Sequence, residues 1–241
     1  MSFQLEYSKY NSNAILINWP SIIDENILED ILKFKLSIQK NYIELKVEVI
    51  NTYSSLLVIY NSIIDNINGE ILTLKAIYSN QISDKKFKLN TWEIPVCYDL
   101  KFATDLEELS IHKQLSKTEI ITLHSRPFYT VFFIGFLPGF LYLGGLDSKL
   151  FIDRKSTPNL NVKKGSIAIG GEQTGIYPQD SPGGWHIIGN SPIELVNPNE
   201  NPPCKISAGD KVKFSPVDLN RYEEILFEIK NGSYHLKAVM S

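Results

Sequence analysis

Apolar and polar residues in the first 90 positions follow the two periods expected of a small α/β layer domain. Residues 43–50 alternate between apolar and charged side chains, which predicts a half-buried strand, and the apolar runs at 4–10, 14–19 and 56–60 predict three more. A helix is predicted to begin at Ser21 and Asp24 and to bury one face made of Ile23, Ile27, Ile31, Phe34 and Ile38. Residues 61–78 predict a second helix, which Gly69 weakens.

From residue 91 onward the pattern changes to short apolar runs separated by glycine and proline turns. Two short helices are predicted at 104–112 and 117–125, the second with a capping box of Ser116 and Glu119. Residues 92–96 predict an edge-like strand, because Pro95 has no N–H to donate. The spacing of the later runs is typical of a β-barrel or a sandwich, with strands at 130–134, 166–169, 186–188, 193–196 and 212–214.

These patterns predict an α+β chain with a small N-terminal α/β domain at 1–90 and a β-barrel domain at 91–220. The tail at 221–241 fits either a strand or a short helix. Residues 127–146 carry no charge and match the length of a membrane span. Pro138 and four glycines would break such a helix repeatedly, so we interpret the run as a buried strand at 129–134 that leads into a structured loop.

Composition excludes several classes of function. The formal net charge is -3 and basic residues do not cluster, which argues against a nucleic-acid or membrane partner. Cys97 and Cys204 lie far apart without metal-ligand spacing, and the N-terminus lacks the features of a signal peptide, so we expect a cytoplasmic protein with reduced thiols. The chain has no P-loop, GxGxxG, GxSxG or HExxH motif, and its four histidines show no metal-ligand spacing.

Glycines mark the region where a site is expected. Of the 14 glycines, 11 lie between Gly135 and Gly189, interleaved with proline and aromatic residues. Such strings describe fixed loops with open amide groups, which can bind a carboxylate or a phosphate. The neighbouring cations are either solvated turn residues or anion ligands, and they are Arg154, Lys155, Lys163 and Lys164. The neighbouring aromatic residues are either core or stacking walls, and they are Phe136, Phe140, Tyr142 and Trp185. His124 and His186 are likewise open to a structural or a site role.

Taken together, the ordered motifs resemble one family. From residue 92 to about residue 218 the chain is similar to the B-type subunits of bacterial 5-oxoprolinase, a family also described as allophanate-hydrolase subunit 1 and as sporulation-kinase inhibitor proteins. The resemblance is carried by EIPV at 93–96, DLEEL at 105–109, His124 with Tyr129 and Val131, GFLPGFLYL at 135–143, GSIAI at 165–169, QTGIYP at 173–178, SPGGW at 181–185 and GD at 209–210. It implies that the second domain is a cyclophilin-like β-barrel.

The resemblance also implies an activity. Family members work with two partner subunits, a homologous one of C type and a separate one of A type, and open the lactam 5-oxoproline to glutamate at the expense of ATP, with Mg²⁺ presumed. The catalytic residues expected on this basis are His124, Gln173 and Tyr177, and His124→Ala should lower turnover while shifting the melting temperature by only about one or two degrees. Residues expected to bind substrate or an anion are Phe136, Pro138, Gly139, Arg154, Gly170, Gly171, Pro182, Gly183, Gly184 and Trp185. The ATP site is expected to be shared with the partner, so that the isolated chain is inactive.

Two segments depart from the family pattern. Residues 98–104 replace a stretch that usually carries glycine, and Asn159 follows Pro158 where an arginine is common. Losing a guanidinium removes a bidentate anion partner, for which Arg154 or Lys163 could compensate. Alternative hypotheses are a regulatory protein that inhibits a sensor histidine kinase and a subunit of a urea/allophanate-type amidohydrolase or carboxyltransferase. A prolyl isomerase is a weaker alternative that rests on the barrel type alone.

Overall fold

The computed structural model describes residues 3–43, 47–81, 87 and 89–240. The chain divides into two compact units, Met1–Lys88 and Leu89–Ser241, each with its own hydrophobic core. Within the described residues, no helix has both the length and the apolar character that crossing a membrane requires. Both cysteines are free thiols, as predicted.

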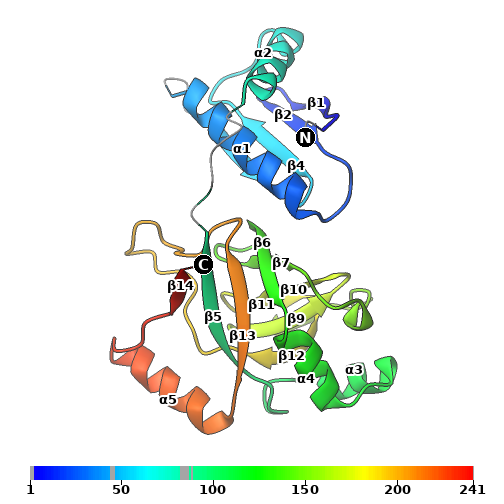
Figure 1. The fold of residues 1–241 in the computed structure, drawn as a ribbon, viewed down its shortest axis with the longest axis vertical. Coiled ribbons are helices and arrows are strands. Elements are labelled where there is room, and N and C mark those ends of the chain that lie inside the picture. The colour runs from blue at the N-terminus through cyan, green and yellow to red at the C-terminus, as the bar shows by residue number, and fades with distance from the viewer. Residues whose placement is uncertain (1–2, 44–46, 82–86, 88, 241) are drawn as a thin grey trace. The chain divides into compact units, whose positions relative to one another are not determined.

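The first unit is an antiparallel four-stranded sheet with two helices. The strand order is β1 (Glu6–Asn11), β2 (Ala14–Asn18), β4 (Ser55–Ile59) and β3 (Glu48–Asn51). Helix α1 (Glu25–Asn41) crosses one face of this sheet and contacts α2 (Ile67–Ser79) (Figure 1). The order of strands and helices agrees with the sequence prediction, although residues 44–46 of the predicted strand at 43–50 lie outside the described residues.

Helix α1 shows why the spacing of its apolar residues was informative. Asp24 caps its N-terminus, its side chain accepting hydrogen bonds from the backbone N–H groups of Asn26 and Ile27. The four residues that follow the helical period are fully buried, namely Ile27, Ile31, Phe34 and Ile38. Ile23, which was predicted to belong to this face, precedes the cap and is 36% exposed.

The second unit is built on a closed seven-stranded barrel, which resolves the choice between barrel and sandwich. Its strand order is β12-β9-β10-β7-β6-β13-β5, and β12 closes the ring by pairing Asn190 with Cys97 of β5. The strands are β5 (Asn90–Cys97), β6 (Phe128–Ile134), β7 (Leu141–Gly144), β9 (Ser166–Gly170), β10 (Gln173–Ile176), β12 (His186–Asn190) and β13 (Lys211–Val217). A separate pair, β8 (Asn159–Val162) with β11 (Ser181–Gly183), lies outside the ring. Helices α3 (Leu106–Lys113) and α4 (Lys117–Ser125) lie between β5 and β6 in the chain, and a short 3₁₀ helix, η1 (Ser148–Leu150), follows β7.

Three predictions for this unit need correction. Strand β5 is central, with β13 on one side and β14 (Ala238–Met240) and β12 on the other. The N–H of Glu93 donates to the carbonyl of Lys237, on the side of β5 that faces β14. Because backbone N–H groups two residues apart point to the same side of a strand, the nitrogen of Pro95 also faces this side. It lies between the pairing of Trp92 with β14 and the pairing of Cys97 with β12. The missing donor is therefore accommodated inside the sheet.

The other two corrections concern where strands occur. Residues 193–196 form no strand, although Ile193 and Leu195 are buried, because apolar residues of a packed loop have the same composition as a short strand. Strands β7 and β10 lie where glycine suggested loops. The Cβ of a larger residue at Gly175 in β10 would lie 2.8 Å from the carbonyl oxygen of Leu141, so glycine here permits close strand contact.

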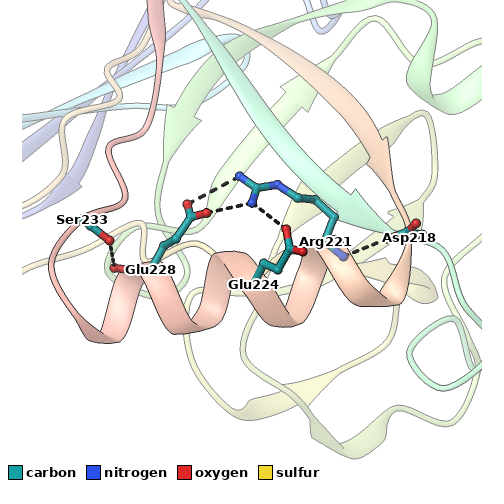
Figure 2. Close-up of polar contacts among 5 residues, drawn as sticks. All are labelled: Asp218, Arg221, Glu224, Glu228 and Ser233. Atoms are coloured by element: carbon teal, nitrogen blue, oxygen red, sulfur yellow. Dashed lines mark hydrogen bonds and ion pairs between the residues drawn. The ribbon is translucent and has the colours of Figure 1, made fainter.

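The C-terminal tail is mainly helical. Helix α5 (Leu219–Lys230) is capped by Asp218, whose side chain accepts from the N–H of Arg221 at 2.8 Å (Figure 2). Figure 2 shows the Arg221 guanidinium reaching along the helix to Glu224 and Glu228, with contacts of 2.9 and 2.7 Å. The chain then returns as β14 against β5, so the tail that the sequence left undecided contains both a helix and a strand.

Candidate functional site

A hollow of about 350 Å³ with largely aromatic walls lies beside the barrel, and we call it the aromatic hollow. Seven of its ten lining residues were predicted from the sequence: Phe136, Arg154, Tyr177, Pro182, Gly183, Gly184 and Trp185. The other three are Phe140, Tyr142 and Pro158. Residues from the loop after β6, the segment before β8, and the 177–185 stretch thus meet in one place, as the glycine and aromatic strings suggested.

Phe140 organises the walls of the aromatic hollow. It is 2% exposed, and its ring meets those of Tyr177 and Trp185 edge-on, with centroid distances of 5.1 and 5.6 Å. Tyr142 lies 4.8 Å from Phe140 and Phe136 5.6 Å from it. Edge-to-face arrangements of this kind are favourable and hold each ring in one orientation. The walls are therefore preformed surfaces for a flat or apolar ligand.

Glycines contribute to these walls because they have no side chain, which lets the rings pack closely against the backbone. A Cβ on Gly183 would lie 2.2 Å from the Tyr177 hydroxyl, and one on Gly170 would lie 2.5 Å from Cδ1 of Trp185. The amide of Gly171 donates to the carbonyl of Ile152 at 2.6 Å, so it is already used and is not available to an anion. The expectation that Gly171 captures an anion through its N–H is wrong for this reason.

Tyr177 contributes a hydroxyl to the aromatic hollow. The phenol oxygen is hydrogen-bonded by the backbone of Trp185, and burial raises the pKa of Tyr177 above its usual value. The hydroxyl consequently stays protonated at neutral pH. Its O–H can donate to a carbonyl or carboxylate oxygen of a ligand.

Arg154 provides the cation of the site. Its guanidinium lies over the Trp185 ring, 5.6 Å from the centroid, and no carboxylate within the described residues forms an ion pair with it. The other basic residues proposed from the sequence are committed, because Lys155 pairs with Asp105, Lys163 with Asp180 and Lys164 with Glu194. Of the two residues suggested as substitutes for the missing family arginine, only Arg154 lines the hollow, next to Pro158.

The remaining predicted residues lie elsewhere. Pro138 is exposed outside the hollow, and Gly139 has a φ of +84° and packs against Val196. Gln173 begins β10 and does not line the aromatic hollow. Its Oε1 is buried without a hydrogen-bond partner among the described residues. Residues 98–104 form the turn between β5 and α3 and do not line the aromatic hollow.

His124 is part of the barrel core. It is completely buried, its ring stacks on Phe214 at 4.7 Å, and both nitrogens are hydrogen-bonded. Nδ1 lies 2.7 Å from the Tyr98 hydroxyl and Nε2 lies 2.9 Å from Oγ1 of Thr174, which itself donates to Ala168. Burial lowers the pKa of His124 to about 3. The structure thus gives this histidine a structural place with no surface for a substrate.

A second hollow of about 670 Å³ adjoins the first through Arg154, which lines both, and we call it the polar hollow. Its walls come from α3, from residues 151–157 and from the turn between β9 and β10. Its polar side chains include Glu108, His112, Glu172 and His186. Only one hint of it is visible in the sequence, the position of His186 directly after Trp185, which in an extended segment turns the two side chains to opposite sides.

Comparisons with known proteins agree on one family. Residues 5–206 match the family model described as carboxyltransferase domain, subdomain C and D. The chain is 33% identical to the B-type subunit of 5-oxoprolinase from Bacillus subtilis, covering 93% of this chain and 99% of the relative. It is 48% identical to the protein of the same name from Haemophilus influenzae, over 51% of this chain and 57% of the relative.

A solved structure extends the likeness of fold. The urea amidolyase of K. lactis superposes with a TM-score of 0.84 over the whole of this chain, at 19% identity, and this chain covers 16% of that protein. The range matched by the family model, 5–206, includes the segments that form both hollows. Because the family model matches residues 5–206 and the Bacillus subtilis relative, at 33% identity, covers 93% of this chain, the chain belongs to the family of 5-oxoprolinase B-type subunits.

Proposed function

We propose that this chain is a subunit of an ATP-dependent 5-oxoprolinase and that its aromatic hollow holds the lactam. The observation that carries the proposal is Arg154, whose guanidinium lies over Trp185 at an aromatic hollow of about 350 Å³ and has no carboxylate partner among the described residues. 5-Oxoproline is a small flat ring that bears one carboxylate. The ring fits against Trp185 and Tyr142, and the carboxylate pairs with Arg154 in a bidentate manner.

The chemistry explains why such a hollow is useful. A five-membered lactam is a resonance-stabilised amide, and transfer of a phosphoryl group to its oxygen makes the ring carbon electrophilic. In this proposal the protonated Tyr177 hydroxyl donates to a ligand oxygen, and the aromatic walls shield the lactam from water on the side that they cover. The role proposed for this chain is therefore to bind and orient the lactam.

The proposal also concerns ATP and Mg²⁺. Among the described residues, no cluster of three His, Cys, Asp or Glu side chains is suited to hold a metal ion. Mg²⁺ bound to nucleotide usually takes carboxylate ligands together with phosphate oxygens. The ATP site stays a proposal as one shared with the partner subunits, and the isolated chain is expected to be inactive.

Reconstitution tests the proposal. Co-expression with a C-type homologue should give a stable complex, and addition of the A-type partner should give ATP hydrolysis that depends on 5-oxoproline. Arg154→Gln should raise the KM for 5-oxoproline about tenfold, because a charge-assisted hydrogen bond is lost. Lys163→Gln is the matched control, since Lys163 pairs with Asp180 outside the hollow and its loss should leave KM unchanged. A folded complex of all three proteins without this ATPase activity would defeat the assignment.

A carboxyltransferase-type function is the second candidate. It is favoured by the family model, whose description names a carboxyltransferase domain. A ureido acid shares with 5-oxoproline a planar amide and a carboxylate, so the same two walls and the same arginine would serve it. Screening lactams against ureido acids for stimulated ATP turnover separates the two. The kinase-inhibitor hypothesis stays a prediction, and Arg154→Gln should not alter kinase binding if that function is independent of the hollow.

A further inference from the structure

Strand β6 contains an extra residue at the point where it passes the aromatic hollow. Val131 of β6 pairs with Leu143 of β7, and the next pair joins Phe133 to Tyr142. Between these two pairs β6 therefore has one residue more than β7, which is a β-bulge. Bulges change the direction of the side chains that follow them and are common beside functional sites.

The bulge decides which face of the barrel carries Phe133. Side chains alternate between the two faces of a strand, and Val131 belongs to the barrel core, so a regular strand would also turn Phe133 to the core. On β7, Leu141 and Leu143 belong to the core and Tyr142 between them lines the aromatic hollow. Because the extra residue shifts the register by one, Phe133 lies opposite Tyr142 and shares its outer face.

Phe133 covers one face of the Tyr142 ring. The two rings are nearly parallel, with an interplanar angle of 13° and centroids 4.0 Å apart. Tyr142 in turn meets Trp185 edge-on, at a centroid distance of 6.0 Å. Tyr142 and Trp185 line the aromatic hollow, whereas Phe133 does not. A change at Phe133 can therefore reach a ligand in the hollow only through the residues that it supports.

We propose that Phe133 is a positioning residue that fixes the Tyr142 ring as a wall of the aromatic hollow. The inference rests on the proposed function for the identity of the ligand. With Phe133 present, the wall is already ordered when the ligand arrives. Without its ring, Tyr142 can turn into the vacated space, and binding must then order the side chain again. The bulge in β6 thus serves binding, because it is what brings Phe133 to this face.

Calorimetric titration of the full chain with 5-oxoproline tests the proposal. Phe133→Leu keeps an apolar side chain but removes the flat ring, so binding should weaken about fivefold. Phe133→Tyr retains the ring and should bind 5-oxoproline like the wild-type chain. Phe128→Leu is the matched control on the same strand, since Phe128 is exposed beside Lys213 and does not line the hollow. Its affinity for 5-oxoproline should be unchanged.

A measurement without ligand keeps this inference separate from the proposed function. Ring flips of Tyr142 can be followed by NMR of the tyrosine-labelled chain, with Tyr142→Phe to assign the signal. They should be about tenfold faster in Phe133→Leu than in the wild-type chain, because the parallel stack that hinders rotation is lost. Phe128→Leu should leave the flip rate unchanged.

The outcomes distinguish the two proposals. Equal flip rates in Phe133→Leu and the wild-type chain overturn the positioning role. Equal affinity of these two proteins for 5-oxoproline overturns it as well, and so does Phe133→Tyr binding as weakly as Phe133→Leu. If 5-oxoproline fails to bind the wild-type chain while the flip rates differ as expected, the lactam assignment is wrong and the positioning of Tyr142 by Phe133 stands.

Discussion

The barrel interior around His124 and the barrel rim around His186 contain the same residue type in opposite states. In the interior, both imidazole nitrogens are bonded and the ring is stacked on Phe214. At the rim, one nitrogen is bonded to Asp153 and the other has no partner among the described residues. Burial is high in both places, so burial alone does not distinguish a structural histidine from a ligand-binding one. The two histidines differ in how completely their ring nitrogens are hydrogen-bonded among the described residues.

The same contrast extends to the surroundings of each histidine. Polar groups near His124 satisfy one another in a closed chain from Tyr98 through His124 and Thr174 to Ala168. At the rim, Arg154 has no carboxylate partner in the described structure, and Glu108 and Glu172 have no cation. A saturated network stabilises the fold, and an unsaturated one leaves binding energy for a ligand. Chemistry is therefore expected at the rim.

Removal of the interior histidine should have the largest effect. His124→Ala leaves a cavity beside Phe214, orphans the buried Tyr98 hydroxyl and leaves the Thr174 hydroxyl with only its bond to Ala168, so the free energy of unfolding should fall by about 3–5 kcal/mol. Urea denaturation followed by circular dichroism measures it. The control His235→Ala replaces an exposed residue and should change stability by less than about 0.5 kcal/mol. A stable His124→Ala protein with reduced turnover would instead restore the site role that the sequence suggested.

Acid should destabilise the fold through the same histidine. Burial lowers the pKa of His124 to about 3, whereas the unfolded chain has the ordinary value of about 6.5. Between these values the unfolded state binds the extra proton, so stability falls as pH decreases, by about 1.4 kcal/mol per pH unit from this residue. Urea midpoints at a series of pH values measure the slope. His124→Phe should flatten it between about pH 6 and 4, and an equal slope in both proteins would contradict the assignment.

The contrast between interior and rim also explains which parts of the fold and of the site could be predicted from the sequence. Glycine and aromatic strings, the neighbouring cation Arg154 and the family resemblance together pointed to seven residues of the aromatic hollow. Glycine marks the places where Tyr177 and Trp185 pack closely against the backbone. Helical spacing located α1, and the capping box of Ser116 and Glu119 located α4. These signals are local, and each depends on neighbours along the chain.

The predictions that failed concern residues whose contacts come from segments distant in the sequence. His124 lies in the last turn of α4, but its hydrogen-bond partners are Tyr98 and Thr174, which lie 26 and 50 residues away. The use of the Gly171 amide by Ile152 is likewise set by pairing across the barrel rim. The polar hollow joins α3 to residues 151–157 and to His186, and no local pattern relates these segments. Saturation of polar groups is a property of the folded chain and was therefore invisible in the sequence.

Two adjacent glycines at the rim give a smaller and more local test. Gly183→Ala places a Cβ 2.2 Å from the Tyr177 hydroxyl, so Tyr177 must move, at a cost of about 1–3 kcal/mol in stability and with loss of 5-oxoproline binding. Gly184→Ala is the matched control, because its nearest neighbour, the carbonyl of Lys155, is 3.6 Å away. Thermal melts and calorimetric titrations measure both. Equal effects of the two substitutions would show that the hollow does not depend on a fixed Tyr177.

Backbone strain at the rim predicts the smallest effect and separates binding from stability. Phe136 lines the aromatic hollow with a φ of 64° and is 63% exposed, while Gln114 ends α3 with a φ of 53° and lines neither hollow. Glycine relieves backbone strain at either position but increases the conformational entropy of the unfolded chain. The free energy of unfolding of each variant should therefore rise by no more than about 1 kcal/mol. Phe136→Gly should nevertheless weaken 5-oxoproline binding about fivefold through loss of the ring contact, whereas Gln114→Gly should leave it unchanged. If both variants bind 5-oxoproline like the wild-type chain, the exposed ring of Phe136 takes no part in binding and its strained backbone has another cause.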